Sequence, residues 1–382
     1  MLSTRMKNLH PYVPGEQPKD REYIKLNANE NPYPPCKQVS EAVAEFVKNH
    51  SEKIALYPDP DSNELKSAVA QMLNVTGGVL CNCTVNKNEC SCSESDKIGF
   101  EITPEMIYVG NGSDEVLSFL FYAFIDSSEK LVLPKFTYSF YPVYAGFYGI
   151  PLDTVPMNDD WSLNTEEMLL HAQKNNSSII FANPNAPSGI ALKRSEIRQM
   201  LLKANSNKIF IVDEAYCDFG EESCIPLLKE FKNLVIVRTF SKSLCAAGSR
   251  LGYAVASPEL INAITTVKNS LNHFPVDSIA QEVGKAVCKN LGYYAACAKK
   301  IVEERNSFTE FLLSLGWEVV PSKTNFVLAK NPKVSGEIVY KKIKEKGILV
   351  RHFSTPGIED YVRITIGTKE QMEKLKNIIK TI

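Results

Sequence analysis

The feature that most constrains the fold is an alternation of short apolar runs with helix-like patterns through the middle of this 382-residue chain. Helical patterns at 114–124 and 193–203 lie between or beside the apolar runs. The runs that read as buried strands are 130–133, 178–182, 208–212, 234–237 and 252–256. This rhythm favours a mostly parallel sheet covered by helices, in which ligands bind outside the carboxyl ends of the strands.

The pattern changes at about residue 275. A long helical stretch runs to about residue 315, and shorter strand-like and helical segments follow it, at 325–328, 335–346, 348–351 and 362–366. The chain is also too long for one small core. We therefore predict an N-terminal arm with part of the small domain at 1–50, a large α/β domain at 51–274, and a small α+β domain at 275–382.

Composition argues against several classes of protein. The net charge is −1, so no basic excess points to nucleic acid or to an anionic membrane. No apolar run reaches the roughly 18 residues that span a bilayer, and the first residues lack the apolar core of a signal peptide. We predict a cytoplasmic protein with mostly reduced cysteines and no nucleic-acid or membrane partner.

A polar segment at 80–100 interrupts the alternation and is expected to be a loop. It carries two Cys-x-Cys pairs, Cys81 with Cys83 and Cys90 with Cys92. Structural zinc sites usually have wider spacing within each pair. Free or adventitiously paired thiols are therefore favoured over zinc, and no metal is predicted.

Lys242 follows the apolar run 234–237 and is the first candidate for chemistry. An amine at the mouth of a buried strand is poorly solvated, so it deprotonates easily and can act as a nucleophile. Thr239, Ser241 and Arg250 beside it suit a phosphate. Together they suggest a Schiff-base lysine that holds pyridoxal 5′-phosphate; a surface lysine after a strand is the alternative.

Polar motifs also fall at the ends of other predicted strands. Gly112, Ser113 and Asp114 precede an apolar helix, whose free N–H groups make an anion site with Ser or Asp as the cap. Asp213 follows the run 208–212, where an ionised carboxylate needs a cation such as a protonated pyridine nitrogen. Tyr216 could then reach the phenolic oxygen of the cofactor. A simple turn cap is the alternative for Asp213.

An aromatic cluster and a proline-rich turn complete the set. The cluster at 136–141 could supply a ring that stacks on a flat cofactor, and core packing is the alternative. The turn 183–189 contains two prolines that could fix an Asn amide against a ligand. Each motif has an ordinary structural explanation alone, but together they provide the parts that pyridoxal chemistry needs.

In this order the motifs resemble those of the fold-type-I pyridoxal-phosphate aminotransferases of class I and II, and within them the histidinol-phosphate aminotransferases. The resemblance covers nearly the whole chain. The matching segments are LHPYVPG at 9–15, LNANENPY at 26–33, YPDP at 57–60, GNGSDEV at 110–116, DEAY at 213–216, TFSK at 239–242 and YVRITIG at 361–367. The resemblance implies an aspartate-aminotransferase-like fold with a seven-stranded sheet.

The resemblance also implies roles in cofactor binding. Lys242 would hold the cofactor and move the proton, and Asp213 would keep the ring nitrogen protonated. Tyr138 would stack on the ring, and Tyr57 would reach the neighbouring site across a homodimer. The phosphate would be held by Thr239, Ser241 and Arg250 with the backbone of Gly112, Ser113 and Asp114.

For the substrate, the resemblance implies that Arg363 binds the α-carboxylate, while Tyr12 and Arg351 face the phosphate end and Asn29 also contributes. Two departures from the family pattern matter. Ala186 stands where the turn usually has the Asn that bonds the cofactor's ring oxygen, which leaves Asn185 or Tyr216 for this contact. Phe136 alters the approach to the ring, so it remains an alternative to Tyr138.

The expected reaction transfers an amino group from a small-molecule donor, histidinol phosphate, to a 2-oxo acid, 2-oxoglutarate, in histidine biosynthesis. Two alternatives keep the cofactor: transamination of an aromatic amino acid, and decarboxylation of a threonine phosphate. A non-enzymatic binding module with an aminotransferase-like fold is the third.

Overall fold

The computed structural model describes residues 2–7, 9–12, 14–80 and 98–382. In this part of the chain the largest sheet has seven strands in the order β2-β8-β7-β6-β5-β3-β4. They are β2 (Ile107–Asn111), β3 (Leu131–Pro134), β4 (Leu152–Val155), β5 (Ser178–Ala182), β6 (Phe210–Asp213), β7 (Leu234–Thr239) and β8 (Leu251–Val255). All neighbours are parallel except β8, which is antiparallel to both β2 and β7. The predicted mostly parallel sheet is confirmed.

Helices cover both faces of this sheet, which is why its central strands are apolar on both sides. Ile180 packs into one core with α4 (Gly112–Phe124), α5 (Tyr141–Tyr148) and α8 (Pro258–Leu271). Its neighbours Ile179 and Phe181 point to the other face. The helices on that face are α3 (Asn63–Thr76), α6 (Thr165–Asn175), α7 (Arg194–Lys203) and α9 (Ser278–Cys288).

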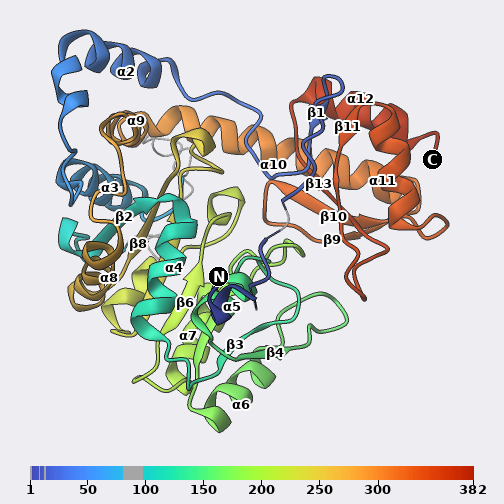
Figure 1. The fold of residues 1–382 in the computed structure, drawn as a ribbon. Helices are drawn as coiled ribbons and strands as arrows, with labels where there is room; N and C mark the ends of the chain where they lie inside the picture. Colours follow the sequence, from blue (N-terminus) through green and yellow to red (C-terminus); the bar gives the residue numbers. More distant parts are fainter. Residues whose placement is uncertain (1, 8, 13, 81–97) are drawn as a thin grey trace.

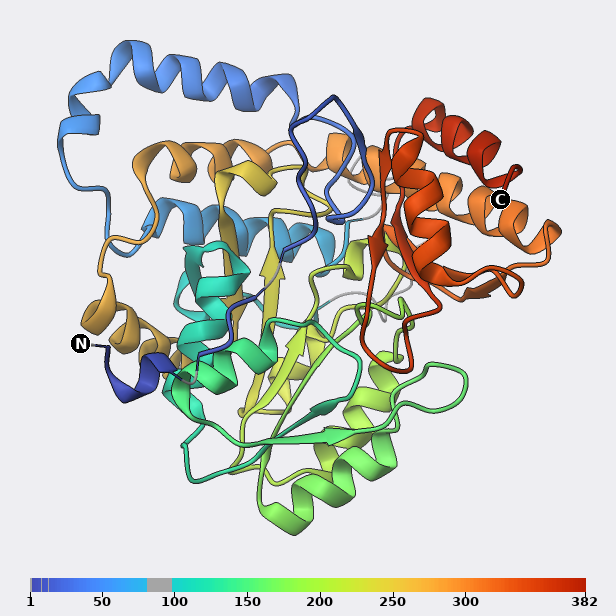
Figure 2. The ribbon, with the colours of Figure 1, turned by 45° about the vertical axis from the view of Figure 1, so that its right-hand side comes forward.

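A second unit has its own core and a four-stranded antiparallel sheet in the order β12-β13-β10-β9. The strands are β9 (Glu318–Val320), β10 (Phe326–Lys330), β12 (Arg351–His352) and β13 (Val362–Thr365). The helices are α10 (Leu291–Ser314), α11 (Gly336–Glu345) and α12 (Lys369–Ile379). This is the predicted smaller α+β unit, and it lies beside the larger one in Figures 1 and 2.

The N-terminal segment joins this smaller unit. β1 (Ile24–Lys25) pairs in parallel with β11 (Ile348–Leu349), so a blue strand lies among red elements in Figure 1. The helix α9 comes directly after the predicted boundary at 275, yet it packs on α3 and on α2 (Lys37–Asn49), which belong to the larger unit. The two predicted domain boundaries, at 50/51 and 274/275, remain predictions.

The other elements are short: α1 (Thr4–Lys7), η1 (Ser51–Ala55), η5 (Pro104–Met106), η6 (Cys217–Phe219), η7 (Ile225–Lys229) and η8 (Ala247–Ser249). Within the described ranges, no helix combines the length and apolarity needed to cross a bilayer. The same ranges contain no cluster of three or more His, Cys, Asp or Glu side chains placed to hold a metal. The predicted loop with Cys81, Cys83, Cys90 and Cys92 lies outside the described residues.

Candidate active site

Two connected cavities lie where the carboxyl ends of β5, β6 and β7 face the second unit. The inner cavity has a volume of about 200 Å3 and the outer cavity about 420 Å3. Both are lined by Ala28, Tyr138, Ala186, Tyr216 and Lys242. The inner cavity alone is lined by Glu30, Ser113, Asp114, Ala182, Asp213, Ala215, Thr239, Ser241, Ala247 and Arg250. Most of the residues predicted to bind a cofactor are therefore brought to one place.

Lys242 stands between the two cavities, in the loop after β7. Its Nζ donates to the backbone oxygen of Ala28 at 3.2 Å and lies 5.8 Å from the ring centroid of Tyr216. Burial, helped by the positive charge of Arg363, lowers the pKa of the Lys242 amine to about 8. A neutral, nucleophilic amine is therefore far more accessible here than on an ordinary lysine.

Asp213 ends β6 and is only 4% exposed. Its Oδ1 accepts from the backbone N–H of Ala215 at 3.1 Å, so the carboxylate does cap the following turn. Its Oδ2 accepts from the hydroxyl of Tyr141 at 2.8 Å. Burial raises the pKa of Asp213 to about 6, although both hydrogen bonds oppose that rise. A cation placed in the inner cavity would favour the charged carboxylate.

The N-terminus of α4 and Arg250 form a cradle at one end of the inner cavity. Gly112 has φ +80°, and a Cβ there would lie 2.7 Å from Arg250 Nη2. A Cβ on Gly252, in the adjacent β8, would lie 2.2 Å from the backbone nitrogen of Ser113. Only glycine at both positions lets these groups approach. Free N–H groups at the start of a helix beside an arginine suit a phosphate.

One detail of the phosphate prediction was wrong. The helix begins at Gly112 and its N-cap is Asn111, which makes no side-chain cap, so neither Ser113 nor Asp114 caps it. Asp114 instead accepts from Arg250 Nη2 at 3.1 Å, which holds the guanidinium at the cavity. Thr239 and Ser241, linked by a 3.0 Å hydrogen bond between their hydroxyls, line the same cavity.

Tyr138 and Phe136 differ in which cavity they face. Tyr138 lines both cavities, and its hydroxyl donates to Asp114 Oδ1 at 2.8 Å. Phe136 lines only the outer cavity, where its ring centroid lies 5.5 Å from that of Trp161. The geometry favours Tyr138 over Phe136 as the ring that stacks on a cofactor.

Asn185 is one of the predicted cofactor ligands that the structure does not place in a cavity wall. It lines neither cavity, because its Nδ2 donates to the backbone oxygen of Phe136 at 2.9 Å and to Ser188 Oγ at 3.1 Å. Ala186, one residue later, occupies the cavity wall instead. Of the two predicted ligands of a cofactor's ring oxygen, only Tyr216 lines the inner cavity.

Tyr216 is oriented for this task by a chain of hydrogen bonds. Thr365 Oγ1 donates to Asn29 Oδ1 at 3.1 Å, and Asn29 Nδ2 donates to the Tyr216 oxygen at 3.0 Å. Since Tyr216 accepts this bond, its own hydrogen can be donated into the cavity. Asn29, predicted to bind substrate, lines the outer cavity and also orients Tyr216.

Two arginines dominate the outer cavity. Arg351 on β12 and Arg363 on β13 are register partners, and the Cζ of each lies 5.6 Å from the ring centroid of Phe353. Arg363 Nη2 donates to the backbone oxygen of Asn27 at 3.3 Å, but its buried Nε has no hydrogen-bond partner in the described part of the chain. Burial lowers the pKa of Arg363, and the charge of Arg351 adds to that effect. Adjacent positive groups of this kind suit an anionic ligand.

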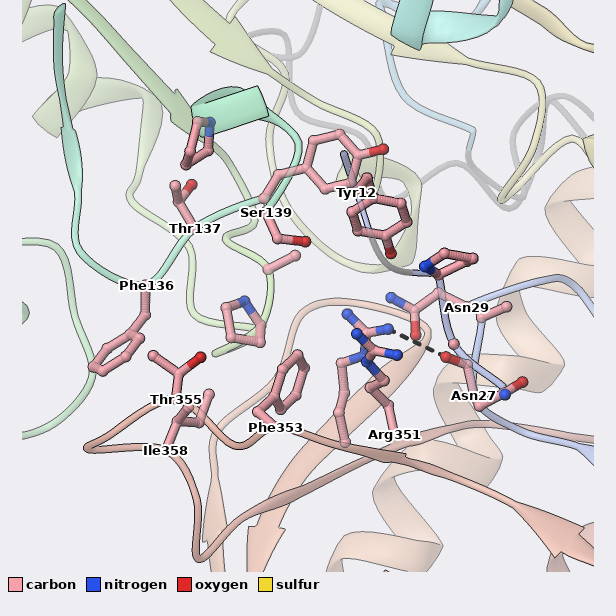
Figure 3. A pocket seen from close by; sticks show the side chains of 18 of the residues that line it. Tyr12, Asn27, Asn29, Phe136, Thr137, Ser139, Arg351, Phe353, Thr355 and Ile358 are labelled. Carbon is pink, nitrogen blue, oxygen red and sulfur yellow. Dashed lines mark hydrogen bonds between the residues drawn. The ribbon is translucent and has the colours of Figure 1, made fainter. Parts of the chain in front are cut away.

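The two remaining predicted residues, Tyr12 and Tyr57, differ in whether they reach the site. Tyr12 lines the outer cavity, with its ring centroid 5.1 Å from that of Phe140. In Figure 3 it approaches from the side opposite Arg351, while Phe136 lies at the far end near Thr355 and Ile358. Tyr57 is 82% exposed, stacks on Phe274 at 4.5 Å and lines neither cavity. Within one chain it takes no part in the site.

Three further residues were given no role from the sequence. Tyr141 bonds Asp213, Thr365 orients Asn29, and Phe353 lies against both arginines. The three-residue spacing of Tyr138, Tyr141 and Tyr144 was a signal for the first. For Phe353 the signal was its position two residues after Arg351, which places alternate side chains of an extended segment on one face.

The comparisons with known proteins agree with this geometry. Residues 21–379 match the family described as aminotransferase class I and II. A histidinol-phosphate aminotransferase from Syntrophus aciditrophicus is 42% identical over 383 residues, covering 100% of this chain and 98% of the relative. One from Acinetobacter baylyi is 40% identical over 378 residues, covering 99% and 96%.

Solved structures show the same fold. A histidinol-phosphate aminotransferase from Sinorhizobium meliloti, in complex with pyridoxal 5′-phosphate, has a TM-score of 0.82 at 22% identity, covering 100% of this chain and 98% of its own. An aspartate aminotransferase from Thermus thermophilus has a TM-score of 0.77 at 20% identity, covering 99% of each chain. The predicted aspartate-aminotransferase-like fold is confirmed, and the chain belongs to the class I and II aminotransferase family.

Proposed function

We propose that this protein is a pyridoxal-phosphate-dependent aminotransferase that moves the amino group of histidinol phosphate to 2-oxoglutarate in histidine biosynthesis. The observation that carries the proposal is the placement of Lys242 between an inner cavity suited to the cofactor and an outer cavity with paired arginines. Both relatives at about 40% identity are histidinol-phosphate aminotransferases, which supports the choice of donor.

The residues of the inner cavity fit the cofactor. The cradle of Gly112, Ser113 and Arg250 suits its phosphate, with Thr239 and Ser241 beside it. Asp213 would pair with the ring nitrogen, Tyr216 would donate to the ring oxygen, and Tyr138 would stack on the ring. The bound cofactor supplies an aldehyde that captures amines and a ring that withdraws electrons.

Lys242 has two tasks in this proposal. Its amine, with a pKa lowered to about 8, would hold the cofactor covalently. The same amine, when free, would accept and donate the proton of the substrate's alpha carbon. Its position between the two cavities suits both tasks.

The paired arginines explain how one site could accept both substrates. Histidinol phosphate carries a phosphate group where an amino acid carries its α-carboxylate. Arg363 would bind either anion, and Arg351 on the neighbouring strand would add the charge that a dianion requires. Tyr12 lines the same cavity and could donate to the phosphate.

Half-reactions with single amino donors test this function. The reconstituted enzyme is mixed with histidinol phosphate, phenylalanine or O-phosphothreonine, and the loss of the visible band of the lysine-bound cofactor is followed. We expect histidinol phosphate to react with the highest kcat/KM. A preference for phenylalanine would contradict the proposal and favour an aromatic donor, for which Phe136 and Phe353 in the outer cavity provide the supporting observation. Release of carbon dioxide from O-phosphothreonine would favour a decarboxylase.

We also propose that the enzyme is a cytoplasmic homodimer in which Tyr57 of one chain reaches the phosphate site of the other. Tyr57 is too exposed to serve its own chain's site. Next to Arg250, a further cavity of about 590 Å3 offers room for a neighbouring chain. Mixing Tyr57→Ala and Lys242→Ala chains tests this arrangement, because a hybrid dimer regains one complete site. Activity above that of either variant alone is expected. If dimers shown to contain one chain of each variant regain no activity, Tyr57 does not serve the neighbouring chain's site.

A further inference from the structure

Three tyrosines from one short segment hold two of the carboxylates that line the inner cavity, Asp114 and Asp213. Tyr138 and Tyr144 donate to Asp114 Oδ1, at 2.8 and 3.4 Å. Tyr141, between them in the sequence, donates instead to Asp213 Oδ2 at 2.8 Å. Tyr141 is fully buried and lines neither cavity, so any effect it has on the chemistry must pass through a neighbour, and its hydroxyl is bonded to Asp213.

The surroundings of Asp213 show why this bond matters. The titratable groups that act on the carboxylate include Asp114 from α4, Glu214 and Tyr216 from the turn after β6, and Tyr141 and Tyr144 from α5. The cations Lys242 and Arg250 line the same cavity. Burial raises the pKa of Asp213, and the charges of Asp114 and Glu214 raise it further. The hydroxyl of Tyr141 and the N–H of Ala215 lower the pKa of Asp213, because donors stabilise the ionised form.

We propose that Tyr141 is a positioning residue whose hydroxyl keeps Asp213 ionised and aimed across the inner cavity toward a cationic ring nitrogen. The ring of Tyr141 also meets that of Tyr138 edge-on, with centroids 5.4 Å apart. One side chain thus fixes the acid partner and contacts the predicted stacking ring. This inference rests on the proposed role of Asp213 toward the cofactor.

The first test uses the apoprotein and does not depend on turnover. Carbon-labelled aspartate allows the pKa of Asp213 to be measured by NMR, with Asp213→Asn to assign the signal. Tyr141→Phe should raise the pKa of Asp213 above its wild-type value. Tyr144→Phe is the matched control, since it removes the same oxygen from the same helix but from a bond to Asp114. An unchanged Asp213 pKa in Tyr141→Phe, or an equal rise in both variants, would overturn the proposal.

The second test measures cofactor affinity against pH. Near neutral pH, Tyr141→Phe should bind the cofactor about threefold more weakly and turn over about tenfold more slowly, which is the range expected for loss of a typical intramolecular hydrogen bond. The affinity difference should shrink as the pH rises, because Asp213 then ionises in both proteins. A merely structural defect would give a loss independent of pH, and that result would contradict the proposal.

A double-mutant cycle separates this inference from the function on which it rests. In an Asp213→Asn background, Tyr141→Phe should no longer change cofactor affinity. If the apoprotein pKa changes as expected but cofactor affinity never does, the role of Asp213 fails while the bond between the two residues stands. If Tyr141→Phe does not fold, a fluorinated tyrosine at position 141 replaces it. This stronger donor should lower the pKa of Asp213, and no change would overturn the proposal.

Discussion

The inner and outer cavities differ in how the protein holds their polar side chains. In the inner cavity the acidic and phenolic groups are held by other parts of the protein: Asp213 by Tyr141, Asp114 by Arg250 and Tyr216 by Asn29. In the outer cavity two arginines face each other across neighbouring strands, and the buried Nε of Arg363 has no partner among the described residues. In one region the polar side chains are tied to one another, whereas in the other two positive charges lie on neighbouring strands.

This difference matches what each region is proposed to bind. A resident cofactor is bound through every cycle, so fixed hydrogen bonds can hold its partners in one geometry. Substrates come and go, and adjacent positive groups bind any anion that relieves their repulsion. The two regions should therefore respond differently to mutation.

Replacement of Lys242, which lies between the two cavities, should have the largest effect on turnover. Lys242→Ala should reduce turnover by about 10⁴-fold, because both the covalent attachment and the proton transfer are lost. Stopped-flow half-reactions and the visible spectrum provide the measurement. Lys242→Arg is the control, since it keeps the charge without the attachment. Substantial activity in either variant would exclude Lys242 as the attachment residue.

A change within the inner cavity should affect turnover more than binding. Asp213→Asn should lower kcat by about 10³-fold, since the charge acts mainly in the transition state. Cofactor affinity, measured by equilibrium dialysis, should fall only about tenfold by comparison. Equal losses in the two quantities would show that Asp213 serves binding rather than chemistry.

A change in the outer cavity should depend on the substrate. Arg351→Ala should lower kcat/KM for histidinol phosphate by about 10²-fold, as for the loss of a charged hydrogen bond, and for glutamate or phenylalanine by much less. Arg351→Lys, which keeps the charge but loses the fork of donors, should be intermediate. Steady-state kinetics with each donor decide this. A uniform loss for all donors would contradict the assignment of Arg351 to the phosphate.

The smallest expected effect is the pH dependence of the rate at which the apoprotein captures the cofactor. Only the neutral amine of Lys242 can attack the cofactor aldehyde, and its pKa is lowered to about 8. The rate of cofactor capture by the apoprotein should therefore rise about tenfold per pH unit below pH 8 and level off above it. Rapid mixing across a pH series measures this rate. A rate that continues to rise toward the ordinary lysine pKa of 10.5 would show that burial does not tune this amine.

The sequence predicted five of the seven strands of the large sheet, because burial on both faces leaves apolar runs with sharp ends, whereas the two edge strands, β2 and β4, were not among the predicted runs. The run 234–237 became β7, and 178–182 became β5 without change. Strand direction leaves no such trace, so the antiparallel β8 was not foreseen. Lys242 and Asp213 were found because a charged group at the end of an apolar strand needs a chemical reason.

Other parts of the site depend on contacts that no local pattern encodes. Tyr141 and Asp213 are 72 positions apart, and their bond exists only after the sheet has formed. Asn185 and Ala186 are adjacent, yet the turn directs the amide toward the backbone of Phe136 and leaves the alanine in the wall. Sequence spacing alone could not decide which of the two faces the ligand.

The parallel pairing of β1 with β11 has a consequence for how the enzyme is made. Ile24 leaves the ribosome early, but its partner Ile348 is synthesised near the end of the chain. At roughly 5–20 residues per second, the N-terminal strand waits for tens of seconds before it can pair. Asn29 waits as well, because Thr365, which orients it, comes later still. The nascent chain can therefore form most of the cofactor's cavity well before it can hold a substrate.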